Sequence, residues 1–352
     1  MKHVIFLCAA MLACHSPVKA GPLIKEQIPA DAKWLLHLDG DNLRGTKLGD
    51  YLFNQVLGKQ LAGAGEQFHF DFSNVLQKVG SLTAYGTDFK KGPEANGVLL
   101  INSDGETRKA LQGLLAAQLL ADTNGPVKKM EQDSRTLYSI ANEIFLTLEA
   151  DRPVIVSKSR SEIDRVHEVL AGKGPSVAAN KTFSGYPTMS NGFFFIGVAE
   201  GFSAPDIIPP QAKALQMADG GRLALGESAD RLSLNLSLRG KSAEVTKQIQ
   251  QVLEGMVALI SLGQPENEDL MQLARSTKVS STPEIVTLMM EFPVAKALAM
   301  LNEHTKPAEP KKPKARHVRR IPKPKEEDVE PAKESAPAKA ADQQNATEKK
   351  AE

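Results

Sequence analysis

Three side chains near the start of the chain are of types that bind divalent metal ions. His37, Asp39 and Asp41 lie at alternate positions in the segment His37-Leu38-Asp39-Gly40-Asp41. On a strand, His37 and Asp39 would point to the same side, with Asp41 just past the strand end. An imidazole and two carboxylates can hold a divalent cation, so one hypothesis for this chain is a metal-dependent hydrolase.

A structural interpretation accounts for the same segment. In it, Asp39 and Asp41 end a strand, Gly40 makes the turn, and Asp41 caps a helix that begins near Asn42. We favour this interpretation, because three ligands so close in sequence seldom converge on a metal ion without a fourth.

The other histidine motifs give less support for chemistry. His69 and Asp71 alternate with phenylalanines, which is typical of a half-buried segment with one polar side. His167-Glu168 begins like the helical zinc-protease motif, but Ala171 occupies the place of the second histidine. The sequence also has no Gly-x-Ser-x-Gly motif, no phosphate-binding loop and no dinucleotide glycine fingerprint. We therefore predict no catalytic set and no cofactor.

Composition and cysteine content narrow the remaining classes. Charged residues make up 24% of the chain and apolar residues 41%, with a net charge of +1, which is typical of a globular protein. Both cysteines, Cys8 and Cys14, lie within the first 20 residues. If that segment is removed, the chain has no disulfide, no thiolate metal site and no cysteine nucleophile.

Residues 1–20 predict a secretory signal peptide. Lys2 begins a short basic start, residues 4–13 are apolar and uncharged, and Val18 and Ala20 suit the narrow pockets of a signal peptidase. Cleavage between Ala20 and Gly21 would export the chain to the periplasm or beyond. The alternative is a lipoprotein, in which Cys14 of Met11-Leu12-Ala13-Cys14 is acylated and tethers the chain to a membrane.

Residues 305–352 form a tail rich in Lys, Pro, Ala and Glu that we predict to be disordered, because it has too few apolar side chains to offset its ordering entropy. One stretch of it is basic and contains no acid. Its cations are Lys311, Lys312, Lys314, Arg316, Arg319, Arg320, Lys323 and Lys325. These could bind an anionic envelope polymer, lipid headgroups or an acidic protein. The stretch lacks interleaved aromatics for base stacking, so we do not predict a nucleic-acid partner, and we favour a solvated tether over a binding role.

Residues 21–304 predict a globular α+β region of antiparallel sheets with flanking helices. The clearest strand is Arg231–Arg239, where leucine alternates with polar residues, so that one face should be apolar and the other exposed to solvent. Further strands are predicted at Trp34–Leu38, Leu82–Tyr85, Val98–Asn102, Ile144–Glu149, Val154–Ser157, Phe193–Val198 and Ile285–Phe292, and additional ones near Lys128 and Lys278. Helices are predicted at Asp104–Leu120, after a Ser159/Glu162 capping box, at Ser242–Leu262 and at Ala295–Leu301.

The order of these elements occurs twice. Residues 81–116 and 222–256 both predict a short strand, a loop, a second strand, a turn and a helix. A tandem duplication, with units at about residues 30–172 and 190–304, would explain this order. The alternative is coincidence, because strand–turn–helix units are common.

One segment carries a resemblance to known proteins. It runs Ile28-Pro29-Ala30-Asp31-Ala32-Lys33-Trp34-Leu35-Leu36-His37-Leu38-Asp39-Gly40-Asp41-Asn42-Leu43-Arg44, followed by Lys47-Leu48-Gly49. Residues 28–50 resemble the start of a family of exported bacterial proteins that has no assigned activity. The resemblance implies export and a bacterial source, and it assigns no role to any residue.

Three hypotheses for function follow. The one we favour is a non-enzymatic binding or scaffolding protein of the bacterial envelope, because a large core-forming region carries no convergent catalytic set. The second is the metal-dependent hydrolase built on His37, Asp39 and Asp41. The third is an inert secreted structural domain with neither partner nor ligand.

Overall fold

The structure is a computed structural model. It describes residues 21–57, 75, 77–89, 93–122, 124–132, 135–180, 183, 192–201, 216–263 and 266–305. The predicted signal peptide, the segment with His69 and Asp71, and the basic tail from Lys311 to Lys325 therefore lie outside the described residues. All the elements below belong to one compact unit, Met1–Thr305.

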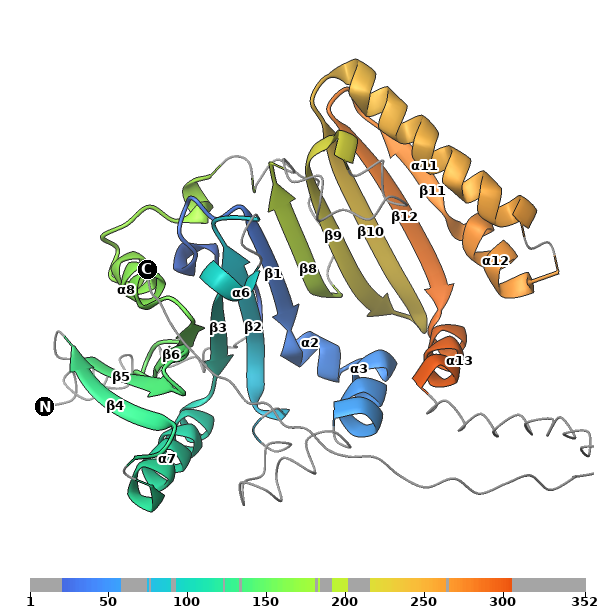
Figure 1. The fold of residues 1–352 in the computed structure, drawn as a ribbon. Coiled ribbons are helices and arrows are strands. Elements are labelled where there is room, and N and C mark those ends of the chain that lie inside the picture. Colours follow the sequence, from blue (N-terminus) through green and yellow to red (C-terminus); the bar gives the residue numbers. More distant parts are fainter. Residues whose placement is uncertain are drawn as a thin grey trace, which may run out of the picture. The chain divides into compact units, whose positions relative to one another are not determined.

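A 12-stranded antiparallel sheet organises this unit, in the order β11-β12-β10-β9-β8-β1-β2-β3-β7-β6-β5-β4 (Figure 1). The strands are β1 (Trp34–Asp39), β2 (Val79–Gly86), β3 (Val98–Ser103), β4 (Val127–Gln132), β5 (Arg135–Ile140), β6 (Ile144–Thr147), β7 (Val154–Ser157), β8 (Phe193–Glu200), β9 (Ala218–Ser228), β10 (Arg231–Gly240), β11 (Lys278–Ser281) and β12 (Ile285–Pro293). The α+β class and the antiparallel pairing predicted from the sequence are confirmed.

Helices of very different length flank the sheet. They are α2 (Gly40–Arg44), α3 (Lys47–Tyr51), α6 (Pro93–Asn96), α7 (Gly105–Ala121), α8 (Arg160–Leu170), α11 (Ala243–Gly263), α12 (Glu268–Ser276) and α13 (Val294–Thr305). Short turns of 3-10 or π type lie at η1 (Lys25–Gln27), η2 (Leu52–Leu57) and η3 (Val177–Ala179). No helix within the described ranges is both long enough and apolar enough to span a bilayer.

Side-chain caps fix where several helices begin. Asp104 caps α7, and Ser159 caps α8 by accepting a hydrogen bond from the Glu162 amide, as the capping box predicts. At α2 the cap is Asp39, whose carboxylate accepts from the Asn42 amide at 2.9 Å. The expectation that Asp41 caps this helix is therefore wrong. The helix starts one residue after the strand ends, so the last strand residue is the one placed to cap it.

The two faces of the sheet are covered differently. On the core face, Leu35, Tyr85, Leu100 and Ile155 pack beneath α8 and the segment around Ile28. The opposite face, which we call the leucine face, is covered by α7 at one end and by α11 at the other. A cross-strand row on the leucine face joins the two ends through Leu236, Leu223, Gly197, Leu36, Ala84, Leu99 and Val156.

The middle of the leucine face is partly open to solvent. Leu36 lies on β1, at the centre of the sheet, yet its side chain is 46% exposed. Its neighbour Leu35 points to the core face and is 1% exposed. Adjacent residues on one central strand therefore have opposite environments.

Strand β10 departs from its predicted pattern on the polar side. The alternation is present, but Ser237 on the polar face is fully buried and donates a hydrogen bond to Asn235, at 3.3 Å between the oxygens. Arg222, the cross-strand partner of Ser237 on β9, is also buried. The expectation of a solvent-exposed polar face is wrong here, because polar side chains of neighbouring strands pack against one another.

Helix α11 outruns the sheet on which it packs. Its first half buries Ile249 and Leu253 against β10 and β12. We expected its apolar stripe to be buried as a whole, but Met256 is 43% exposed and Ile260 is 38% exposed. A helix of 21 residues is about 31 Å long at 1.5 Å per residue, so its last turns extend past the strands.

Strand order on the two sides of the β1–β8 pair is similar. Outward from that pair come β1, β2, β3 and β7 on one side, and β8, β9, β10 and β12 on the other. A helix follows the third strand on each side, α7 after β3 and α11 after β10. The duplication itself stays a prediction, because similar strand order does not demonstrate a common origin.

Candidate functional site

A polar pocket of about 760 Å³ lies at one edge of the sheet. Strands β1 and β3 end at this edge and continue into α2 and α7, while β2 begins there. Strands β1 and β3 run in the same direction in the antiparallel sheet, so their ends and the helices that follow meet at the same edge. The lining is Ile24, Gln27, Asp41, Arg44, Gln77, Lys78, Gly80, Asn102, Ser103, Asp104, Gly105, Arg108, Asp151, Arg152 and Pro153.

Two groups in the lining carry unpaired polar atoms. Arg108 donates from Nη1 to the Ser103 carbonyl at 2.6 Å, which fixes its guanidinium at the start of α7. Its Nε is buried and has no hydrogen-bond partner among the described residues. The same holds for the Oγ of Ser103, a residue that is 6% exposed. An unsatisfied buried polar group costs about 1–3 kcal/mol, so a ligand with acceptor oxygens would be favoured here.

The start of α7 adds a positive helix terminus to the pocket. The Asp104 carboxylate accepts from the Thr107 amide at 2.6 Å, and this hydrogen bond lowers the pKa of Asp104. Asp104 is therefore ionised at neutral pH. A methyl group on Gly105 would meet no atom within 4 Å, so the first turn of this 17-residue helix faces open space. Exposed first-turn amides and the helix dipole both favour an anion at this position.

Three further cations line the pocket, and each has an acidic partner. Arg44 donates to the Val79 carbonyl at 2.9 Å and pairs with Asp41. Lys78 lies 3.1 Å from Glu106, which raises the pKa of Lys78 chiefly through their hydrogen bond. Arg152 contacts a carboxylate oxygen of Glu149 at 3.1 Å and a ring nitrogen of His167 at 3.2 Å.

Both signs of charge meet in this pocket. Four basic and three acidic side chains belong to its lining, which leaves a formal excess of one positive charge. Amides of Gln27, Gln77 and Asn102 add neutral donors and acceptors. The arrangement can hold a ligand that carries an acidic group together with several hydroxyls, since the cations bind the acid and the carboxylates accept from hydroxyls.

The proposed metal ligands do not converge in the described part of the chain. His37 is held between the Thr83 hydroxyl at 2.9 Å and the Gly21 carbonyl at 3.0 Å. Asp39 caps α2, and Asp41 pairs with Arg44 at the pocket rim. No group of three His, Cys, Asp or Glu side chains within the described ranges is arranged to hold a metal ion. Each of the three residues has a structural contact instead.

His37 is buried in its neutral form. Its Nε2 faces a carbonyl oxygen, which only accepts, so Nε2 carries the proton and Nδ1 accepts from Thr83. Burial lowers the pKa of His37, and the Gly21 hydrogen bond and the charge of Asp39 offset part of this effect.

We expect His37 to make stability fall on acidification. Its pKa in the folded protein is below the value of about 6.5 in an unfolded chain, so its contribution is present above that pH and is lost as the pH falls toward the folded value. Urea denaturation at pH 7 and pH 5 measures the change in the free energy of unfolding. His37→Gln should show a smaller change than the parent, because all carboxylates are common to both proteins. An equal change in both proteins would contradict the assignment.

A second buried histidine is also occupied by structural contacts. His167 on α8 lies 3.2 Å from the Thr147 hydroxyl and 3.4 Å from Glu149. Burial is the main cause that lowers the pKa of His167. The structure thus places His167 beneath α8, where it braces the helix against β6.

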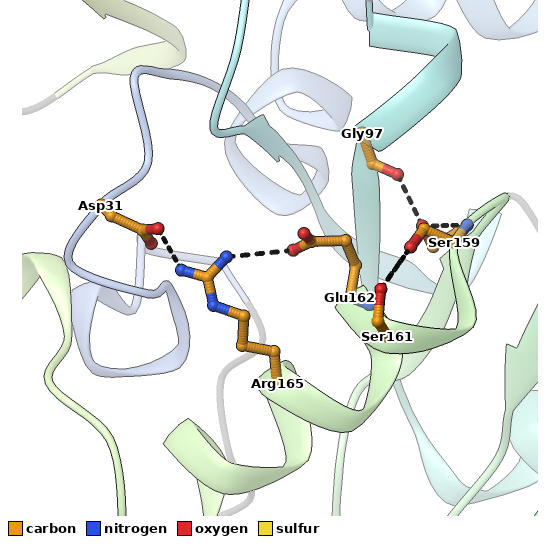
Figure 2. Close-up of polar contacts among 7 residues, drawn as sticks. Asp31, Gly97, Ser159, Ser161, Glu162 and Arg165 are labelled. Atoms are coloured by element: carbon orange, nitrogen blue, oxygen red, sulfur yellow. Dashed lines mark hydrogen bonds and ion pairs between the residues drawn. The ribbon is translucent and has the colours of Figure 1, made fainter.

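A polar cluster at the start of α8 has a bracing role (Figure 2). Arg165 lies between two carboxylates, pairing with Asp31 and lying 3.5 Å from Glu162. Ser159 and Ser161 are hydrogen-bonded to each other at 2.9 Å. Their described hydrogen bonds include no histidine, so the cluster has no base to activate a serine. It ties α8 to the loop that precedes β1.

Comparisons with known proteins add little. No protein-family model matches the sequence, and no curated protein matches it. Among solved structures, crystal form III of TP0453 aligns with a TM-score of 0.46 and 10% identity, covering 81% of this chain and 100% of that one. Crystal form IV aligns with a TM-score of 0.45, 10% identity and coverage of 80% and 98%. Crystal form I gives 0.42, 9%, 81% and 98%. Similarity at this level carries no inference about this chain.

Sequence reasoning did not single out the pocket residues. Asp104 was expected only at the start of a helix, and Arg108 and Arg152 carried no motif. The signal that existed was the Ser-Asp-Gly segment at 103–105 between a strand and a helix. Which other segments would surround it could not be inferred from neighbours in sequence.

Proposed function

We propose that this protein is a non-enzymatic binding protein of the bacterial envelope and that its pocket binds an acidic saccharide. The unpaired Arg108 Nε and Ser103 Oγ, both buried in the lining, carry the proposal. They are donors fixed in position before a ligand arrives. The described lining contains no histidine and no cysteine, which favours binding over catalysis.

The size and charge of the pocket favour a saccharide over a small inorganic anion. A volume of about 760 Å³ is within the range of about 300–1,000 Å³ typical of organic ligands. Asp41, Asp104 and Asp151 would repel a compact, highly charged anion, but they accept hydrogen bonds from hydroxyls. The predicted signal peptide and the resemblance of residues 28–50 to exported proteins place such a ligand in the envelope, where acidic polysaccharides occur.

Titration calorimetry with uronic acid tetrasaccharides tests this proposal. We expect the chain from Gly21 to Glu352 to bind them, and to bind a neutral glucose tetrasaccharide at least about tenfold more weakly, since one ionic hydrogen bond contributes roughly 1.5–3 kcal/mol. Arg108→Gln should remove most of the affinity for the acidic ligand. Lys109→Gln is the matched control, because Lys109 is exposed on the same helix and is not part of the lining.

The basic tail needs a separate control. A chain that ends at His304 lacks the cations of residues 311–325 and keeps the pocket. If the truncated chain binds as well as the full chain and Arg108→Gln does not, binding belongs to the pocket. Binding that is lost on truncation and unaffected by Arg108→Gln would assign the ligand to the tail and overturn the pocket proposal.

A further inference from the structure

The residue predicted to begin the mature chain is built into the fold. Gly21 is buried, and its carbonyl accepts the hydrogen bond from the buried His37 at 3.0 Å. A methyl group on Gly21 would lie 3.1 and 3.3 Å from the two carboxylate oxygens of Asp39. The backbone at Gly21 therefore lies directly against this carboxylate.

Asp39 is a buried carboxylate without a cationic partner in the described chain. It is 7% exposed, and its two oxygens accept from the Asn42 amide at 2.9 Å and from the Asn42 side chain at 2.7 Å. Neither donor is charged. The nearby Arg44 pairs with Asp41. A buried charge is costly unless an opposite charge accompanies it.

We propose that signal-peptide cleavage completes this site. Hydrolysis of the Ala20–Gly21 bond adds one water, leaves a carboxylate on Ala20 and gives Gly21 an amine, which takes up a proton. The resulting α-ammonium group forms a buried ion pair with Asp39. The amino nitrogen and the methyl position considered above are bonded to the same Cα, so the nitrogen reaches the carboxylate by a small rotation of the terminal residue.

The precursor cannot make this pair, because its Gly21 nitrogen is an uncharged amide. Maturation would therefore stabilise the folded chain as well as release it. The absence of a side chain at Gly21 is consistent with this role, since a methyl group there would crowd both oxygens of Asp39. Ile24 and Gln27, which follow Gly21, line the polar pocket. An anchored terminus would thus also hold one wall of it, a consequence that alone depends on the proposed function.

The experiment is a cycle of four proteins. The chain beginning at Gly21 is produced by removing an N-terminal tag in vitro, and half of it is N-acetylated. The same two forms are made with Asp39→Asn, which removes the charge and keeps a residue that caps helices well. Urea denaturation at pH 7 gives the equilibrium constant of unfolding for each. Acetylation should raise that constant at least about tenfold when residue 39 is Asp and less than about twofold when it is Asn.

Two results would overturn the proposal. The first is an equal effect of acetylation in both backgrounds, which would assign the effect to the added group and not to the lost charge. The second is a mass spectrum of the exported chain whose first residue is not Gly21, including one that shows an acylated Cys14. Neither result depends on saccharide binding, so the proposed function stands or falls separately.

Discussion

Leu35→Ala should lower the free energy of unfolding by about 2–5 kcal/mol, whereas Leu36→Ala should lower it by about 1 kcal/mol or less. The two leucines are adjacent on β1 and are identical in type. Leu35 is 1% exposed on the core face, beneath α8 and the Ile28 segment, so its truncation leaves a cavity. Leu36 is 46% exposed on the leucine face, so its truncation removes few contacts.

Urea denaturation of both variants measures the difference directly. The comparison is internally controlled, because strand, neighbours and substitution are the same for both. Comparable losses would show that the middle of the leucine face is covered in solution. A large loss for Leu36→Ala alone would mean that the two faces of β1 are reversed.

Arg239→Met should lower the free energy of unfolding by about 3–5 kcal/mol, because it leaves a carboxylate buried without its cation. Arg239 on β10 pairs with Glu200 on β8, whose side chain is 8% exposed. The strand between them places Gly220 opposite both residues, so that no side chain separates the pair. The register of three strands therefore brings the two charges together.

Arg231→Met provides the control for this prediction. Arg231 also lies on β10 and pairs with Glu291 on β12 at 3.0 Å, but the two side chains are 42% and 59% exposed. Exposed pairs contribute about 0–1 kcal/mol, so this variant should unfold at nearly the parent urea concentration. Equal losses for the two variants would contradict the difference in burial on which the prediction depends.

Features with a local cause were predictable from the sequence. The leucine–polar alternation of β10, the cap of α7 at Asp104 and the capping box of α8 depend on residues close together in the chain. Strands near Lys128 and Lys278 were also expected, and they are present as β4 and β11. The helices α2, α3 and α12 were not predicted individually, because α2 and α3 are 5 residues long and α12 is 9, too short for a clear periodicity.

The environment of each face was decided by the tertiary structure. The sequence cannot distinguish Leu35 from Leu36, or Arg239 from Arg231, because composition and spacing are the same in each pair. Burial depends on where α8 and α11 lie and on how β8, β9 and β10 are aligned. For the same reason the apolar stripe of α11 was expected to be buried along its full length, although the strands end before the helix does.

The sequence by itself determined the α+β class, most strand and helix positions, and the segment His37–Asp41 as the richest in polar side chains. Only the tertiary structure placed His37 against Gly21, Asp39 at the cap of α2 and Asp41 beside Arg44. It also brought Ser103, Arg108 and Arg152 to one pocket from segments far apart in the chain. The physical reason is that periodicity and capping act between near neighbours, whereas a site is formed by the strand register and helix packing that join distant ones.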